Sequence, residues 1–130
     1  MDDIELLVAA RDAVESSYAP YSEYYVGAAL VTDDGSVFTG CNIENANYSN
    51  SVHAEELAIS KAIEAGHRSF EAIAVSSDRR DGVTPCGMCR QSLSEFCNDE
   101  LRIVCDGTAE PVVYTLGELL PNTITSEHLQ

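Results

Sequence analysis

Two short motifs hold the residue types that could do chemistry in this sequence. One is His53-Ala54-Glu55, and the other is Pro85-Cys86-Gly87-Met88-Cys89. Imidazole nitrogen and thiolate sulfur are ligands that zinc prefers. We expect Pro85 to begin a helix, so that Cys86 and Cys89 lie in its first turn and share one helix face. His53, Cys86 and Cys89 are therefore a candidate zinc site with one ion per chain.

Both motifs stand where a helix is expected to begin. A helix N-terminus offers unpaired N–H groups and the positive end of the helix dipole, and both favour thiolates. Three protein ligands leave the fourth tetrahedral position of a zinc ion open, as in catalytic sites. Glu55 would lie near such an ion without binding it, where a carboxylate can transfer protons.

Two other interpretations of these residues stay open. Cys86-x-x-Cys89 could be a thioredoxin-like redox pair, although that motif normally follows the first strand of its fold and this one comes late in the chain. Alternatively, Cys41 could be the fourth ligand of a closed structural zinc site. The closed site gives Glu55 no role.

The hydrophobic patterns around the motifs predict the elements that must position them. We expect helices over residues 3–17, 54–65, 85–97 and 116–120, and strands over residues 26–32, 37–41, 70–76, 101–105 and 111–115. Asp34-Gly35 predicts a hairpin turn between the first two strands. The resulting order α-β-β-α-β-α-β-β-α is typical of an α/β fold with one mixed, five-stranded sheet between helices.

Length and composition favour one domain over residues 1–130. The 130 residues are 45% hydrophobic, which is enough for a substantial core. No apolar run approaches the roughly 18 residues of a membrane span, and the acidic start resembles no secretory signal, so we expect a cytoplasmic protein with no membrane partner. Five cysteines, an odd number, argue against a disulfide framework.

The charge of the chain excludes one class of partner. Twenty-two acidic residues against seven basic ones give a formal net charge of −15. A surface this acidic repels phosphate backbones, so we expect no binding to nucleic acid. Such a surface also suits a salt-rich cytosol, where screening weakens self-repulsion; an ordinary acidic protein is the alternative.

Together the two motifs are the signature of zinc-dependent deaminases, and the whole chain resembles the cytidine deaminases of the small, homotetrameric kind. The likeness is densest in four further stretches: 19–22 (APYS), 26–30 (VGAAL), 40–46 (GCNIENA) and 77–91, which ends in PCGMCRQ. The resemblance implies a three-layer α-β-α fold, a homotetramer, and a zinc-dependent hydrolysis of cytidine or deoxycytidine in pyrimidine salvage, with Glu55 as the proton-transfer residue.

The resemblance also implies the residues that bind a nucleoside substrate. Asn42 and Glu44 hold the ribose hydroxyls, Tyr24 stacks on the pyrimidine, and a backbone group of Ala54 orients the base. The carboxylate of Glu44 would repel a 5′-phosphate. A deaminase of another nucleoside-like substrate and a non-catalytic, zinc-stabilised module are the alternative functions.

The chain departs from the family pattern at four positions. Most tetrameric relatives have cysteine where His53 stands and arginine where Glu56 stands, and they tend to have phenylalanine in place of Tyr24 and Ile124. Tyr24 can still stack on a base. Ile124 cannot, which puts in question the base contact that relatives make from a neighbouring subunit.

Overall fold

The structure, a computed structural model, describes residues 1–78 and 82–129. The helices are α1 (Asp3–Val14), α2 (Ala54–Glu64), α3 (Gly87–Phe96) and α4 (Leu116–Leu119), and the short 3₁₀ helices are η1 (Tyr48–Asn50) and η2 (Ser126–Leu129). The strands are β1 (Val26–Thr32), β2 (Val37–Cys41), β3 (Phe70–Ser77), β4 (Arg102–Cys105) and β5 (Val112–Thr115). The order of helices and strands expected from the sequence is confirmed.

The five strands form one mixed sheet in the order β2-β1-β3-β4-β5. Strand β1 is antiparallel to β2 and β3, β4 is antiparallel to β5, and β3 runs parallel to β4. A parallel pair needs a crossover connection, which α3 provides. Because the chain leaves β3 at its carboxyl end and then enters α3, the start of α3 lies at that edge of the sheet, where α/β proteins bind ligands.

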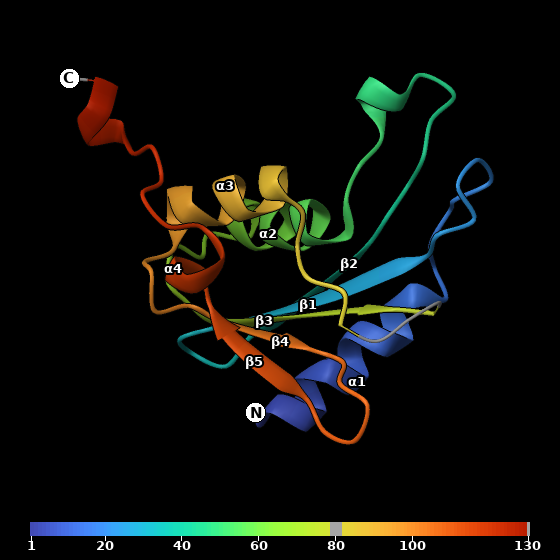
Figure 1. The fold of residues 1–130 in the computed structure, drawn as a ribbon, viewed down its shortest axis with the longest axis horizontal. Coiled ribbons are helices and arrows are strands. Elements are labelled where there is room, and N and C mark those ends of the chain that lie inside the picture. Colours follow the sequence, from blue (N-terminus) through green and yellow to red (C-terminus); the bar gives the residue numbers. More distant parts are fainter. Residues whose placement is uncertain (79–81, 130) are drawn as a thin grey trace.

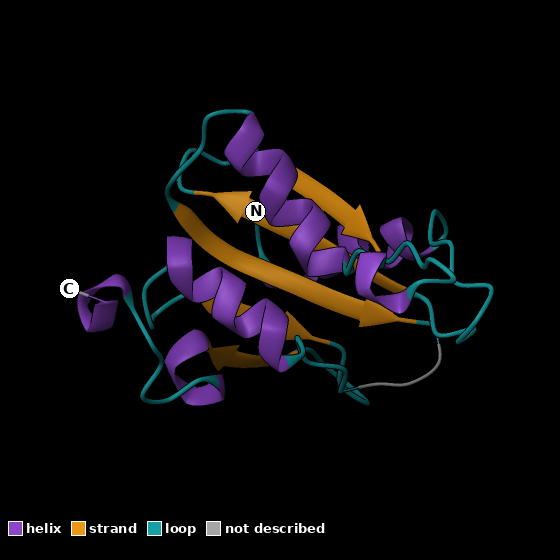
Figure 2. Ribbon diagram, turned by 90° about the horizontal axis from the view of Figure 1, so that it is seen from above, coloured by secondary structure: helices purple, strands orange, loops and turns teal. Residues whose placement is uncertain are grey.

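Alternate residues of the central strands face two separate cores. Ala28, Leu30 and Ile73 face the core beneath α2 and α3, whereas Ala29 and Val31 face the core beneath α1. This alternation follows from the two-residue period of a strand. Figure 1 shows α1 on one side of the sheet and α2 and α3 on the other, and Figure 2, seen from above, shows helices lying across the face of the sheet. The three-layer α-β-α prediction is confirmed.

Two glycines let helices approach the sheet closely. A Cβ atom at Gly27 would lie 2.1 Å from the carbonyl oxygen of Ala10 in α1, and one at Gly40 would lie 2.2 Å from that of Ala54 in α2. Both distances are far below van der Waals contact, so a side chain there would force the backbones apart. Gly40 thus sets how the first turn of α2 lies on β2.

The start of α3 differs from the sequence prediction. Cys86 has an extended backbone (φ −69°, ψ 169°) and is the N-cap residue, so Pro85 lies before the helix rather than at its first position. The fixed φ of proline suits an extended residue as well as a helical one, which is why the sequence pattern misplaced the boundary. Helix α1 is also shorter than expected, because after Val14 the amides of Ser16 and Ser17 bond to carbonyls three residues back.

None of the helices in the described part of the chain has both the length and the apolar character needed to cross a bilayer.

Candidate metal centre and active site

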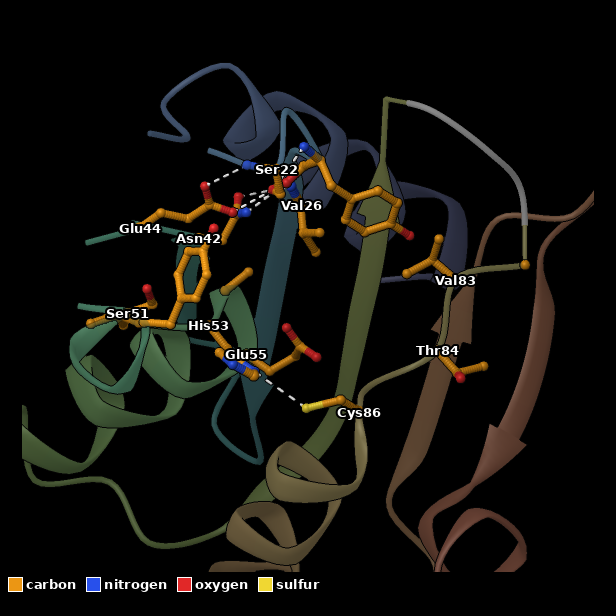
Figure 3. Close-up of a pocket in the computed structure, with 15 residues that line it drawn as sticks. Ser22, Val26, Asn42, Glu44, Ser51, His53, Glu55, Val83, Thr84 and Cys86 are labelled. Carbon is orange, nitrogen blue, oxygen red and sulfur yellow. Dashed lines mark hydrogen bonds between the residues drawn. The ribbon is translucent and has the colours of Figure 1, made fainter. Parts of the chain in front are cut away.

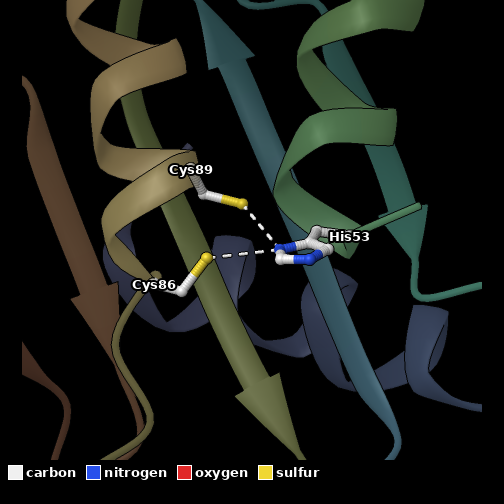
Figure 4. A group of neighbouring side chains, drawn as sticks. All are labelled: His53, Cys86 and Cys89. Carbon is white, nitrogen blue, oxygen red and sulfur yellow. Dashed lines mark hydrogen bonds between the residues drawn. The ribbon is translucent and has the colours of Figure 1, made fainter. Parts of the chain in front are cut away.

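Three side chains of ligand type meet where α2 and α3 begin. His53 is the N-cap residue of α2, Cys86 is that of α3, and Cys89 lies in the first turn of α3. The Nδ1 atom of His53 is 3.2 Å from Sγ of Cys86 and 3.3 Å from Sγ of Cys89. Figure 4 shows both sulfur atoms directed at the imidazole ring. The structure thus brings together the three ligands predicted from the sequence.

The donor atoms fit zinc in type and spacing. Tetrahedral bonds of about 2.3 Å to sulfur and 2.0 Å to nitrogen place these atoms about 3.5 Å apart, close to the separations of Nδ1 from the two sulfurs. Burial, reinforced by the nearby Glu55 and Cys86, raises the pKa of the Cys89 thiol well above its usual value. A bound cation reverses this penalty, because a thiol that coordinates a metal is deprotonated.

Cys41 does not join this group. It is buried at the end of β2. Among the described residues, the group whose potential ligand atoms lie within 4.8 Å of one another consists of His53, Cys86 and Cys89. The closed four-ligand site therefore has no support in this geometry. The three-ligand arrangement leaves one tetrahedral position for a water molecule or substrate.

Glu55 lies beside the three ligand residues and is only 6% exposed. Burial raises the pKa of its carboxyl group, while its own backbone amide, His53 and Cys89 act in the opposite direction. A carboxyl group with a raised pKa can accept and release a proton closer to neutral pH, as a general acid–base catalyst must. Figure 3 shows the carboxylate of Glu55 pointing into the cavity in front of the ligands.

This cavity has a volume of about 620 Å³, within the usual range for small-molecule sites. Its walls come from the loops before β1 and after β2, from the start of α2 and from the segment that precedes α3 (Figure 3). All the candidate site residues except the buried Cys89 line it: Tyr24, Asn42, Glu44, His53, Ala54, Glu55 and Cys86.

Asn42 follows β2 directly, and its side chain bonds to backbone groups at the start of the neighbouring strand β1. Its Oδ1 atom accepts a hydrogen bond from the Val26 amide at 2.9 Å, and its Nδ2 atom donates one to the Tyr24 carbonyl at 2.7 Å. Asn42 therefore braces the segment that carries Tyr24. An amide has four hydrogen-bonding positions, so two remain for a ligand.

Glu44 is an ionised carboxylate at the exposed end of the cavity. Its oxygens accept hydrogen bonds from the backbone amides of Tyr21 and Ser22, at 3.1 and 3.0 Å, and from the Ser22 hydroxyl. The hydroxyl contact is the main reason that the pKa of Glu44 lies below its usual value, and the two amides add to it. Glu44 and Asn42 thus reach the cavity from the same loop. Glu44 offers a charged carboxylate, and Asn42 offers a neutral amide.

The cavity is also lined by residues that the sequence did not single out as site residues, among them Ser22 and Tyr48. Ser22 holds Glu44 in place, and Tyr48 packs edge-on against Tyr21 with ring centroids 6.0 Å apart. The polar stretch 42–51 predicted only a loop, because contacts between distant segments leave no periodic signal. The contact between the two tyrosine rings joins residues 27 positions apart, and a sequence pattern could suggest it only through their residue type.

The departure at Glu56 has a structural explanation. Its carboxylate accepts a hydrogen bond from the His53 backbone amide at 3.1 Å, at the start of α2. This contact fixes the backbone of a metal ligand. A glutamate three residues after the N-cap residue is a known signal for a helix start, so this contact could have been found from the sequence.

Comparisons with known proteins agree with this site. The sequence model of a family described as "Cytidine and deoxycytidylate deaminase zinc-binding region" matches residues 1–105. The chain belongs to this family. Cytidine deaminase from Sporosarcina psychrophila is 43% identical over 98% of this chain and 95% of the relative, and that from Halalkalibacterium halodurans is 42% identical over 99% and 98%.

A crystal structure of cytidine deaminase from Burkholderia pseudomallei has the same fold, with a TM-score of 0.90 and 43% identity over 95% of this chain and 100% of that one. Membership of a zinc-binding deaminase family, together with the His-Cys-Cys group, identifies zinc as the cofactor. The matched residues of the family model include every candidate site residue and end at Cys105.

Proposed function

We propose that this deaminase-family protein hydrolyses cytidine and deoxycytidine to the corresponding uracil nucleosides and ammonia. One observation carries the proposal: a buried carboxyl group, Glu55, lies beside a zinc-type ligand group and faces a cavity of nucleoside size. Relatives more than 40% identical over nearly their whole length carry the name cytidine deaminase.

The proposed reaction assigns a role to each residue of the centre. His53, Cys86 and Cys89 hold zinc through one nitrogen and two sulfurs. Zinc, when bound, lowers the pKa of water enough to provide a nucleophile near neutral pH. Glu55 accepts the proton that the water loses, and the oxygen adds to C4 of the cytosine ring. Glu55 would deliver this proton to N3. It would then take the proton of the new C4 hydroxyl and pass it to the amino group, so that the C4–N bond breaks, ammonia leaves and a C4 carbonyl remains.

The other end of the cavity selects the substrate. Hydrogen bonds hold Glu44 in its ionised form, so it can accept hydrogen bonds from ribose hydroxyls, and its charge disfavours a 5′-phosphate. Asn42 has unused hydrogen-bonding positions for the same sugar. Tyr24 offers a ring face for the base, and Ala54 offers backbone groups near Glu55. This arrangement favours a free nucleoside over a nucleotide.

A substrate panel tests this assignment. Zinc-loaded protein is incubated with cytidine, deoxycytidine, cytosine, cytidine 5′-monophosphate and adenosine, and ammonia release is measured. We expect rapid release from the first two and much slower release from the others. No release from cytidine would contradict the proposal, and preferential release from another compound would identify a deaminase of a different nucleoside-like substrate.

We also propose a homotetramer that acts in the cytoplasm in pyrimidine salvage. Large apolar side chains remain exposed on the single chain, as expected of a surface that another copy covers. Several of them lie on α1, α3, β5 and the C-terminal residues, among them Ile4, Met88, Phe96, Val113 and Ile124. Residues 126–129 extend away from the body of the molecule (Figure 1), where a neighbouring subunit could contact them.

A further inference from the structure

Arg90 follows the ligand Cys89 directly and makes three side-chain hydrogen bonds. Its Nε donates to the Pro85 carbonyl at 2.7 Å, its Nη2 donates to the Thr84 hydroxyl at 2.9 Å, and its Nη1 donates to the Leu119 carbonyl at 2.8 Å. One planar guanidinium thus joins three segments of the chain. The side chain is half-buried, where hydrogen bonds from a charged donor are stronger than at the surface.

Two of these contacts fix the residues that lead into Cys86. Pro85 is fully buried, and Thr84 lines the cavity. The backbone amide of Arg90 also donates to the Cys86 carbonyl at 2.9 Å, as the first turn of α3 requires. Because Cys86 itself is extended and exposed, the position of its sulfur depends on how the residues before it are held.

The third contact connects the metal-binding helix to the C-terminal segment, residues 119–124. Next to Arg90, the Gln91 amide donates to the Ile124 carbonyl at 3.0 Å and accepts from the Thr123 hydroxyl at 3.0 Å. Two adjacent residues of α3 therefore hold both ends of this segment. The segment lies beyond residues 1–105, which the family model matches.

We propose that Arg90 is a positioning residue. It holds residues 84–86, which lead into α3, to the C-terminal segment and thereby sets the geometry of the metal centre. The guanidinium is suited to this role because its donors have fixed directions within one plane, whereas the lysine ammonium is a point charge on a flexible stem. The proposal rests on the proposed function, since it takes Cys86 and Cys89 as zinc ligands.

The test compares Arg90→Lys with the wild-type protein without using turnover. Zinc transfer to a chromogenic chelator measures metal retention, and the visible absorption of the cobalt(II)-substituted protein reports the arrangement of the two thiolates. Residues that orient metal ligands typically contribute 10- to 100-fold to metal affinity. We expect Arg90→Lys to lose about tenfold in affinity and to shift the cobalt bands, although the charge is kept.

Arg68→Lys is the matched control. Arg68 also donates to two backbone carbonyls, those of Ile63 and His67, but it lies exposed after α2 and outside the cavity lining. We expect its zinc retention and cobalt spectrum to equal those of the wild-type protein. Equal behaviour of Arg90→Lys and the wild type would overturn the proposal, because charge alone would then suffice.

If Arg90→Lys does not fold, the zinc-transfer rate of the Thr84→Val variant tests the proposal instead. Valine keeps the shape of threonine and removes only the acceptor of Nη2, so faster zinc transfer would support the proposal and an unchanged rate would overturn it. Failure of the proposed function would be seen in a different experiment. If the wild-type protein bound zinc but released no ammonia from cytidine, the proposed function would be wrong, and the zinc-retention comparison would still test the role of Arg90.

Discussion

Two carboxylates in the same cavity have opposite environments. Burial raises the pKa of Glu55, whereas hydrogen bonds from Ser22 and its neighbours lower that of Glu44. When the environments of two carboxyl groups move their pKa values apart, the group with the raised pKa can transfer protons, and the group with the lowered pKa stays charged. In the proposed function, Glu55 therefore performs the chemistry, and Glu44 recognises the sugar as a charged group near neutral pH.

Replacing Glu44 by alanine tests its role in recognition. The variant loses the charged acceptor at the mouth of the cavity but no contact with the ligand residues, so we expect KM for cytidine to rise about tenfold or more while zinc stays bound. Hydrogen bonds to charged groups are commonly worth about 1.5–3 kcal/mol. Steady-state kinetics with cytidine and free cytosine measure the effect, and an equal loss with both would show that Glu44 does not bind the ribose.

The capping contact of Glu56 gives a second prediction for a single residue. Glu56→Ala removes the acceptor for the His53 amide, and we expect a loss of about 1 kcal/mol in the free energy of unfolding. Glu56→Gln keeps an acceptor and removes the charge, so it should retain most of the stability. Denaturant unfolding of both zinc-free variants makes the comparison. Equal destabilisation by both substitutions would show that the effect comes from the charge of Glu56 and not from its hydrogen bond with the His53 amide.

At the scale of the elements, the site depends on where two helices begin. Histidine and cysteine types and spacing were enough to predict the ligands, because each motif stands at a helix start. The exact cap of α3 was not predictable, since Pro85 is compatible with both an extended and a helical residue. The bracing of Tyr24 and Val26 by Asn42 was not predictable either, because it joins segments far apart in sequence.

The close approach of β2 and α2 predicts that Gly40→Ala disturbs the site from a distance. Its Cβ atom would overlap the Ala54 carbonyl oxygen, at 2.2 Å, and must push back the turn that holds His53 and Glu55. Overpacking typically costs about 1–3 kcal/mol. We expect a lower free energy of unfolding by that amount and reduced turnover.

Gly87→Ala is the control for this substitution. A Cβ atom at Gly87 would meet no atom of another segment within 4 Å, and the backbone φ of Gly87 is not positive. Thermal unfolding and cytidine turnover measure both variants. A stability of Gly40→Ala equal to that of Gly87→Ala would contradict the claim that the helix and strand are in contact there.

At the scale of the whole molecule, the charge of −15 is the dominant feature. Basic residues in the described part of the chain are bonded within it: Arg11 to Asp106, Arg102 to Asp3, and Lys61, Arg68 and Arg90 to backbone carbonyls. They neutralise few of the surface carboxylates. The excess of negative charge, and the repulsion that follows from it, could be predicted from composition alone. The attachment of residues 119–124 to α3 could be seen only in the three-dimensional structure.

The excess charge predicts salt-dependent assembly. The Debye length is about 30 Å at 0.01 M salt and about 3 Å at 1 M, so like charges on neighbouring subunits repel strongly only at low salt. We expect sedimentation velocity to show tetramers at 1 M sodium chloride and smaller species at 0.01 M. A monomer at both concentrations would contradict the proposed tetramer, and an identical tetramer at both would contradict the role of charge.

The central claim is that Glu55 transfers the protons of a zinc-dependent deamination, and Glu55→Gln tests it most directly. The amide keeps the size of the side chain but cannot accept or deliver a proton, and general acid–base steps contribute about 10²- to 10⁴-fold. We predict that the variant folds, retains one zinc per chain by elemental analysis, and loses cytidine turnover by at least about 10²-fold. A zinc-loaded variant that releases ammonia from cytidine at near wild-type rate would contradict the account.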